Sequence, residues 1–246
     1  MELKDILNVD DELNIYLVAN GLKPASMITV NSINPKLDDK VTQEERTQDE
    51  VKHVDFRLNP DVVDTLKLLL EEQGIFYKDW AEENISPFFK GSKKFMEHTY
   101  HGHMFNIGST QENLDRLLGA ETNEERGIAL GFPKEAIDAY KKIIDGERRD
   151  GTYVHVSLAK AKQAGLELPT WLAYICFIPE NLDLVNGNVS ESSKALAESY
   201  QKFVRENNPE LAERVEKHFL ERKLPDKWYK DRDGGYSCFF EPLAKD

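Results

Sequence analysis

The fold class is decided by the stretch Asn59-Pro-Asp-Val-Val-Asp-Thr-Leu-Lys-Leu-Leu-Leu-Glu-Glu-Gln-Gly74. Asn59 is a good N-cap residue, proline suits the first helical position that follows it, and Gly74 suits a helix end. The apolar residues between them recur with helical spacing and form one stripe: Val62, Val63, Leu66, Leu69 and Leu70. Such a stripe must pack against another layer. The sequence therefore predicts an amphipathic helix that covers a sheet or a second helix.

Sequence on both sides of this helix favours strands. A β-like segment begins at Ile75-Phe76-Tyr77, and a second candidate strand runs from Lys94 to Ile107, preceded by a turn at residues 90–93. The first 35 residues fit two short strands, or a helix followed by a strand. Residues 36–52 have no aromatic residue and are mostly charged, Gln or Thr, which predicts a mobile loop or linker.

Helical patterns dominate the rest of the chain. One helix is predicted from Ser109 to Gly119, one from Pro133 to Gly146, and two more at residues 190–206 and 209–222. Short strands are predicted at 152–156 and 236–240, and the apolar segment 171–178 fits a buried strand or helix. We expect one α+β domain over residues 1–246, helix-rich with a small antiparallel sheet, about six helices by these patterns and a possible helical C-terminal subdomain at 190–224.

Composition restricts the class of protein. The 246 residues carry 32 Lys+Arg and 45 Asp+Glu, a net charge of −13. An acidic chain repels polyanions, which makes nucleic acid an unlikely partner and argues against an anionic membrane surface. No apolar run is long enough for a membrane helix, the N-terminus lacks a secretory profile, and the two cysteines cannot form a disulfide framework. We expect a cytoplasmic location.

The most unusual local feature is Glu97-His-Thr-Tyr-His-Gly-His103. In a strand, Glu97, His101 and His103 share one face, and His98 lies on the other. His101 and His103 are therefore candidate metal ligands, with His155 as the third, because a catalytic zinc or iron site usually has three protein ligands. They are equally candidates for general acid–base catalysis or phosphate contact. The plain alternative is a polar edge strand with no site.

Two further segments are candidate ligand contacts. The strand leads into Gly108-Ser109-Thr110, where a helix N-terminus presents free N–H groups to an anion. Ordinary helix capping explains the same residues. The corner Gly131-Phe132-Pro133 offers Phe132 as a pocket wall, or as a packing residue at a helix–helix turn.

Residues from Leu66 to about Tyr140 resemble a family of uncharacterised archaeal and bacterial proteins. The resemblance is carried by Gly-Ile-Phe-Tyr at 74–77, by the segment 105–114, and by Gly-Ile-Ala-Leu-Gly-Phe-Pro at 127–133. Some members carry cysteines just after this proline and further downstream, which implies a metal or redox site in those proteins. Here Lys134, Glu135 and Ala136 follow the proline, so any cysteine-based site is absent or replaced. The resemblance implies a shared fold more than an activity.

Two functional hypotheses follow. In the first, the chain is a small-molecule- or metal-binding protein, with a divalent metal as the candidate cofactor. Its pocket would lie between the strand that carries His101 and His103, the helix start at Gly108–Thr110 and the corner at Gly131–Pro133. In the second, it is a non-catalytic interaction or regulatory protein that uses its C-terminal helices, 190–222, as the partner surface or forms a homodimer through them. The sequence leaves open whether the protein is an enzyme.

Overall fold

The computed structural model describes residues 2–142, 171, 191–221, 227–230 and 236–239. This part of the chain is α+β, as predicted, and contains nine helices and seven strands. The chain divides into two compact units, residues 1–119 and 120–246, and each is described by itself. That residues 1–246 form one folding domain stays a prediction.

Unit 1 combines a five-stranded sheet with helices. Its elements are, in chain order, α1 (Leu3–Ile6), α2 (Val9–Ala19), β1 (Ala25–Asn31), the 3-10 helix η1 (Pro35–Lys40), β2 (Val41–Gln48), β3 (Val51–Leu58), α3 (Pro60–Glu72), β4 (Phe76–Lys90), β5 (Lys93–Gly108) and α4 (Gln111–Leu118). A helix followed by a strand, one of the two alternatives for the N-terminal segment, is therefore what forms.

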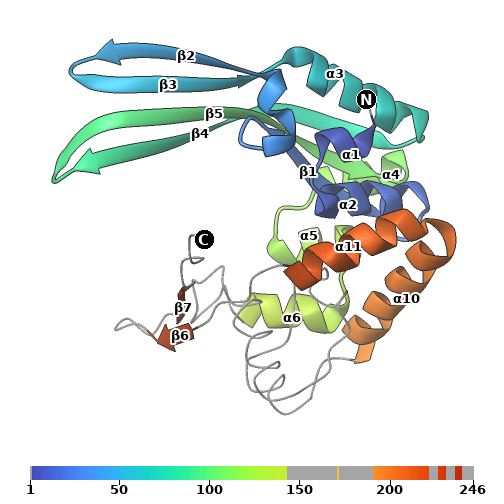
Figure 1. Ribbon diagram of the computed structural model, residues 1–246. Coiled ribbons are helices and arrows are strands. Elements are labelled where there is room, and N and C mark those ends of the chain that lie inside the picture. The colour runs from blue at the N-terminus through green and yellow to red at the C-terminus, as the bar shows by residue number, and fades with distance from the viewer. Residues whose placement is uncertain (1, 143–170, 172–190, 222–226, 231–235, 240–246) are drawn as a thin grey trace. The chain divides into compact units, whose positions relative to one another are not determined.

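The sheet is built around β5. One edge of β5 pairs with β4, and its other edge pairs with β3 and then with β1, while β2 pairs with β3. The predicted small antiparallel sheet is wrong in one respect, because β3 and β5 run parallel and the sheet is mixed. Period-two patterning identifies strands but does not give their relative direction. Figure 1 shows the hairpins β2–β3 and β4–β5 extending beyond the helices of unit 1.

Residues 36–52 do not form the predicted loop. They form most of η1, all of β2 and the β2–β3 turn, and β2 pairs with β3 along its whole length. Seven of the eight β2 residues are exposed. Because neither face of β2 enters a core, its sequence has no apolar alternation by which a strand could have been recognised.

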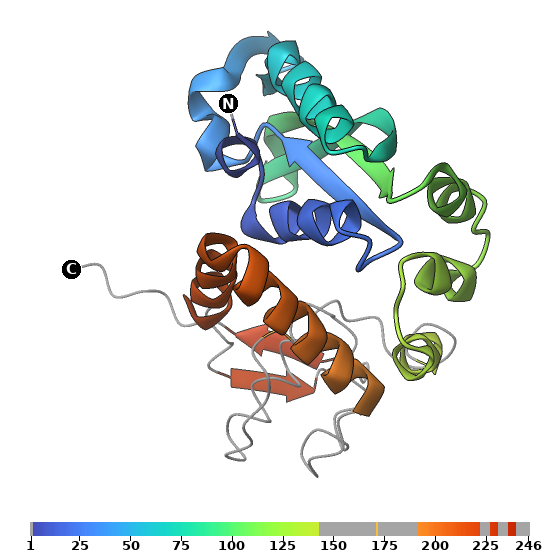
Figure 2. The ribbon, with the colours of Figure 1, turned by 90° about the vertical axis from the view of Figure 1, so that its right-hand side faces the viewer.

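The core of unit 1 lies between the sheet and helices α1, α2 and α3 (Figure 2). The predicted helix at 59–74 is confirmed as α3, with the Asn59 side chain accepting from the Asp61 N–H. Gly74 has φ +69°, a conformation that favours glycine and ends the helix. The α3 stripe forms one buried cluster with Ile28 and Val30 of β1 and with Phe105 and Ile107 of β5. This packing fixes which face of β5 points toward α3.

Unit 2 contains α5 (Asn123–Ala129), α6 (Lys134–Lys142), α10 (Glu191–Asn207), α11 (Pro209–Glu221) and a hairpin of β6 (Lys227–Lys230) and β7 (Tyr236–Phe239). The predicted helices at 190–206 and 209–222 are confirmed. Glu216 of α11 accepts hydrogen bonds from Arg205 and Gln201 of α10 and from the buried Trp171. The predicted strand at 152–156 lies outside the described residues.

Within the described residues, every helix is too short or too polar to span a membrane.

Candidate functional site

The candidate site lies where β5 changes its neighbour. β3 pairs with β5 up to Tyr100, and β1 pairs with it from Gly102 onward. His101 is the residue between the two partners. Its backbone is held by Ser32, whose N–H donates to the His101 carbonyl at 3.0 Å and whose Oγ accepts from the His101 N–H at 3.2 Å. After Leu58, β3 leaves the sheet and the chain continues into α3. Next to His101, therefore, neither β3 nor β1 is paired with β5.

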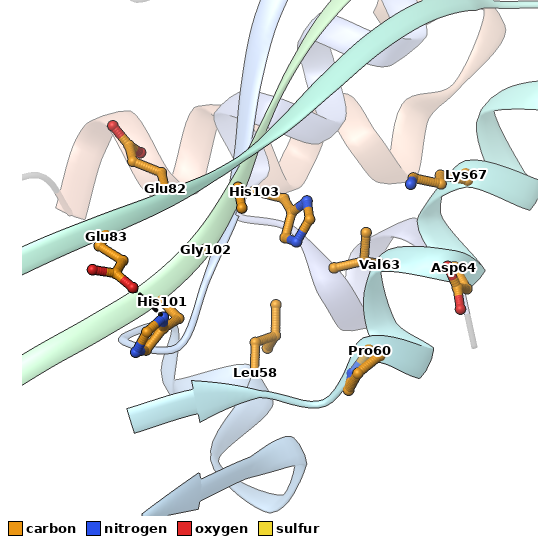
Figure 3. A pocket seen from close by; sticks show the side chains of 11 residues that line it. Leu58, Pro60, Val63, Asp64, Lys67, Glu82, Glu83, His101, Gly102 and His103 are labelled. Atoms are coloured by element: carbon orange, nitrogen blue, oxygen red, sulfur yellow. Dashed lines mark ion pairs between the residues drawn. The ribbon is translucent and has the colours of Figure 1, made fainter. Parts of the chain in front are cut away.

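A pocket of about 470 Å³ lies at this position. Its apolar wall is formed by Leu58 at the end of β3 and by Pro60 and Val63 at the start of α3 (Figure 3). His101 and His103 line the opposite wall, and Figure 3 shows the His103 ring lying toward Val63. The predicted strand is confirmed, and it brings these two candidate residues to one pocket.

Each of the two imidazoles has a carboxylate from β4 beside its Nδ1. His101 Nδ1 lies 3.5 Å from Glu83 Oε1, and His103 Nδ1 lies 3.6 Å from Asp79 Oδ2. These are ion-pair distances, longer than a good hydrogen bond. His101 Nε2 and His103 Nδ1 are buried and make no hydrogen bond with the described residues. Buried polar atoms without a hydrogen bond are uncommon in folded proteins, so His101 Nε2, the ring nitrogen away from Glu83, has unused hydrogen-bonding capacity.

Lys67 completes the polar side of the pocket. Its Nζ lies 2.9 Å from Asp79 Oδ2, which joins α3 to β4 beside His103. Burial acts to raise the pKa of Asp79, but the hydrogen bond and charge of Lys67, with the charge of His103, lower it below the ordinary value. Asp79 is thus held as a carboxylate, and it balances the charge of Lys67.

Glu97, the carboxylate expected on the same face as His101 and His103, contacts other residues. It accepts from Lys94 at 2.8 Å and lies 3.1 Å from Nδ1 of His53 on β3. His98 lies on the other face of β5, as predicted, where its ring contacts Phe56 and Phe88. Asp79, Glu83 and Lys67 are not among the site residues predicted from the sequence. The spacing of Asp79, Ala81 and Glu83 along one face of β4 was the available signal, but only a known strand register connects it to the histidines.

A metal site with three protein ligands is not found in the described part of the chain, where no three His, Cys, Asp or Glu side chains are grouped to hold an ion. His155, the predicted third ligand, lies outside the described residues. The set of His101, His103 and His155 stays a prediction.

The segment Gly108-Ser109-Thr110 has structural partners. A Cβ at Gly108 would lie 2.7 Å from the Leu114 backbone nitrogen, so only glycine fits there without displacement. Ser109 Oγ donates to the Pro24 carbonyl, and Thr110, not the predicted Ser109, caps α4. These three residues do not line the histidine pocket. A ligand at this helix start, or at Phe132 in unit 2, remains a prediction.

The C-terminal helices, considered as a partner surface, bury most of their described apolar side chains. Ala197, Tyr200 and Val204 of α10 are buried, as are Leu211 and Val215 of α11. The exposed large hydrophobic side chains that the structure describes lie on other elements. The hypothesis that residues 190–222 dock a partner therefore gains no support from these side chains.

Comparison with known proteins does not add an assignment, because no family model, curated protein or solved structure matches this chain. The resemblance of residues 66–140 to archaeal and bacterial proteins stays a prediction.

Proposed function

We propose that this protein binds a small molecule in the histidine pocket of unit 1, with His101 and His103 as the groups that contact its polar part. The observation that carries the proposal is the pair of histidine–carboxylate contacts on one wall, His101 with Glu83 and His103 with Asp79. A carboxylate beside Nδ1 orients an imidazole and favours a proton on that nitrogen, which leaves Nε2 as an acceptor. Two such acceptors suit a ligand that donates hydrogen bonds.

Charge narrows the class of ligand. Two of the residues that line the pocket, Asp64 and Glu83, bring carboxylates to it, against the single ammonium of Lys67, while the Glu82 side chain points away from the histidines (Figure 3). The charge of Lys67 is already balanced by Asp79. An acidic pocket with an apolar wall favours a small amine whose hydrocarbon part packs on Leu58 and Val63, because opposite charges attract and apolar surface gains from burial.

The imidazoles of His101 and His103 also place acid–base groups beside a molecule bound in the pocket. Imidazoles accept and donate protons near neutral pH, so a bound substrate would meet a general base or acid at His101 and His103. Binding is the central proposal, and catalysis by these residues would require it.

The test is a fragment screen by ligand-observed NMR with three matched sets: small amines, their neutral isosteres and the corresponding carboxylic acids. We expect amines to bind best and acids worst. The variant His101→Gln/His103→Gln should lose this binding, while His53→Gln/His98→Gln, which changes two histidines outside the pocket, should keep it. Equal binding of the three ligand sets, equal binding by the native protein and both double variants, or no binding in any set would contradict the proposal.

A further inference from the structure

The hairpin β4–β5 exposes an unusual amount of apolar surface. Of the ten large hydrophobic side chains that are exposed in the described residues, six lie on this hairpin. Four of the six lie in its outer half: Ile85, Phe88, Phe89 and Phe95. Contiguous exposed apolar side chains rimmed by charge are typical of interaction surfaces.

The charges along β4 are arranged in a self-complementary way. Apart from Lys78, the charged residues before the uncharged segment 84–89 are acidic, at Asp79, Glu82 and Glu83, and those after it are basic, at Lys90 and at residues 93 and 94 at the start of β5. β4 is an edge strand of the sheet, because β5 is its one partner. An antiparallel second copy along this edge would place the acidic end of each strand opposite the basic end of the other.

Two residues fix where the centre of such a contact would lie. Lys93 and Lys94 already pair with Glu50 and Glu97. Glu82 and Lys90, by contrast, have no ion pair in the part of the chain that the structure describes. They stand at equal distances along the strand on either side of Ser86, and an even spacing puts all three side chains on one face of β4.

We propose that a second copy of this chain docks antiparallel along β4, with the two-fold axis at Ser86, Glu82 of each copy facing Lys90 of the other, and the uncharged residues 84–89, which include Ile85, Phe88 and Phe89, between these pairs. A two-fold contact uses the same patch on both copies, so the patch must complement itself. Pro87 lacks an N–H, so the contact is made by side chains and not by a continuous backbone ladder. This inference is independent of the proposed ligand pocket.

Charge-reversal variants test this geometry. Sedimentation equilibrium of the full chain measures the dissociation constant of the dimer for each of them. We expect the native protein to show twice the chain mass of 28.3 kDa. Glu82→Lys or Lys90→Glu alone places like charges opposite each other twice, and should raise the dissociation constant about tenfold. The double variant Glu82→Lys/Lys90→Glu places opposite charges across the contact again. An equimolar mixture of the two single variants does the same, because the two lysines of one chain face the two glutamates of the other. Both should restore association.

The control for net charge is Glu112→Lys on α4, which should leave the dimer unchanged. In a background without native cysteines, Ser86→Cys should form an intermolecular disulfide under mild oxidation, and Ser92→Cys at the hairpin turn should not. A protein that is monomeric at all concentrations, or a dimer insensitive to the single reversals or not restored by the exchange, would overturn the proposal. His101→Gln/His103→Gln should remain dimeric, which separates this contact from ligand binding.

Discussion

Asp79 Oδ2 lies 3.6 Å from His103 Nδ1, although the residue directly opposite Asp79 on β5 is Phe105. The contact is diagonal across the strand pair, a neighbour relation that longer side chains can bridge. Lys67 holds the same carboxylate oxygen from α3 at 2.9 Å. One carboxylate thus links the helix, the edge strand and the central strand at the wall of the pocket.

The Lys67–Asp79 pair should contribute to stability in a pH-dependent way. The folded pKa of Asp79 is lowered, so its contribution is present above the unfolded value of 3.8 and is lost as pH falls through the folded pKa. We expect Asp79→Asn to reduce the free energy of unfolding by about 1 kcal/mol at neutral pH, because both side chains are partly screened by solvent. Urea unfolding at pH 7 and pH 3 measures this, and the difference should be smaller at the lower pH, because pH 3 lies below the unfolded pKa of 3.8. Asp64→Asn, an exposed carboxylate of the same pocket, should have little effect at either.

Gly102 lies where β1 begins to pair with β5, and it has no room for a side chain. A Cβ there would lie 2.8 Å from the Val30 carbonyl oxygen and 2.9 Å from Asn31 Cβ. We expect Gly102→Ala to push β1 away from β5 and to cost about 2 kcal/mol of stability. Thermal unfolding compares it with Gly119→Ala, where the nearest atom is 3.2 Å away. An equal loss of stability in the two variants would show that β1 can move away from Gly102 at little cost in free energy.

Burial raises the pKa of Asp11 in α2 to about 7, against hydrogen bonds from the Thr29 N–H and the Asn8 side chain that act to lower it. The folded state therefore holds a proton that the unfolded state releases, and stability from this group falls as pH rises from about 4 to 7. We expect Asp11→Asn to raise the free energy of unfolding by about 1 kcal/mol or more at pH 8 and to change it little at pH 4. Chemical denaturation at the two pH values measures the difference. A gain of the same size at both would mean that the carboxylate charge is not responsible.

A measurement of bound metal distinguishes the proposed small-molecule pocket, with His101 and His103, from the metal site predicted from the sequence, which adds His155. Two imidazoles are fewer than the three protein ligands that catalytic zinc usually has, so we expect dialysis to remove zinc from the protein. Elemental analysis after dialysis measures this. About one zinc per chain that is retained, and is lost in His155→Ala, would instead support the three-histidine site predicted from the sequence.

Helix positions and the histidine face could be predicted because each depends on local pattern. The spacing from Val62 to Leu70 gives one helical stripe, and the i, i+2 spacing of His101 and His103 gives one strand face. Both features are confirmed in the structure. The polar hairpin at 41–58 could not be predicted, because its outer strand buries nothing and so carries no apolar alternation.

The histidine partners depend on the β4–β5 register, which the sequence does not reveal. The register shifts by one residue between Phe88 and Phe89, and Phe95 is the extra residue on β5. Without this bulge, Glu82 and not Glu83 would lie opposite His101. The side chains of Asp79 and Glu83 would then lie on the face of the sheet away from the histidines, because a one-residue change of register moves every side chain of a strand to the opposite face. No local propensity marks the bulge, so Asp79 and Glu83 were found only in the structure.

Histidine-detected NMR gives the sharpest test of small-molecule binding by His101 and His103. Protein labelled with ¹³C-histidine gives one ring signal for each of its six histidines, assigned by single substitution, and is titrated with the small amines that suit the pocket. We expect the His101 and His103 signals to move together and saturate, while those of His53 and His98 stay in place. Saturating binding that moves other histidine signals, or no movement of this pair at any concentration, would contradict the proposal.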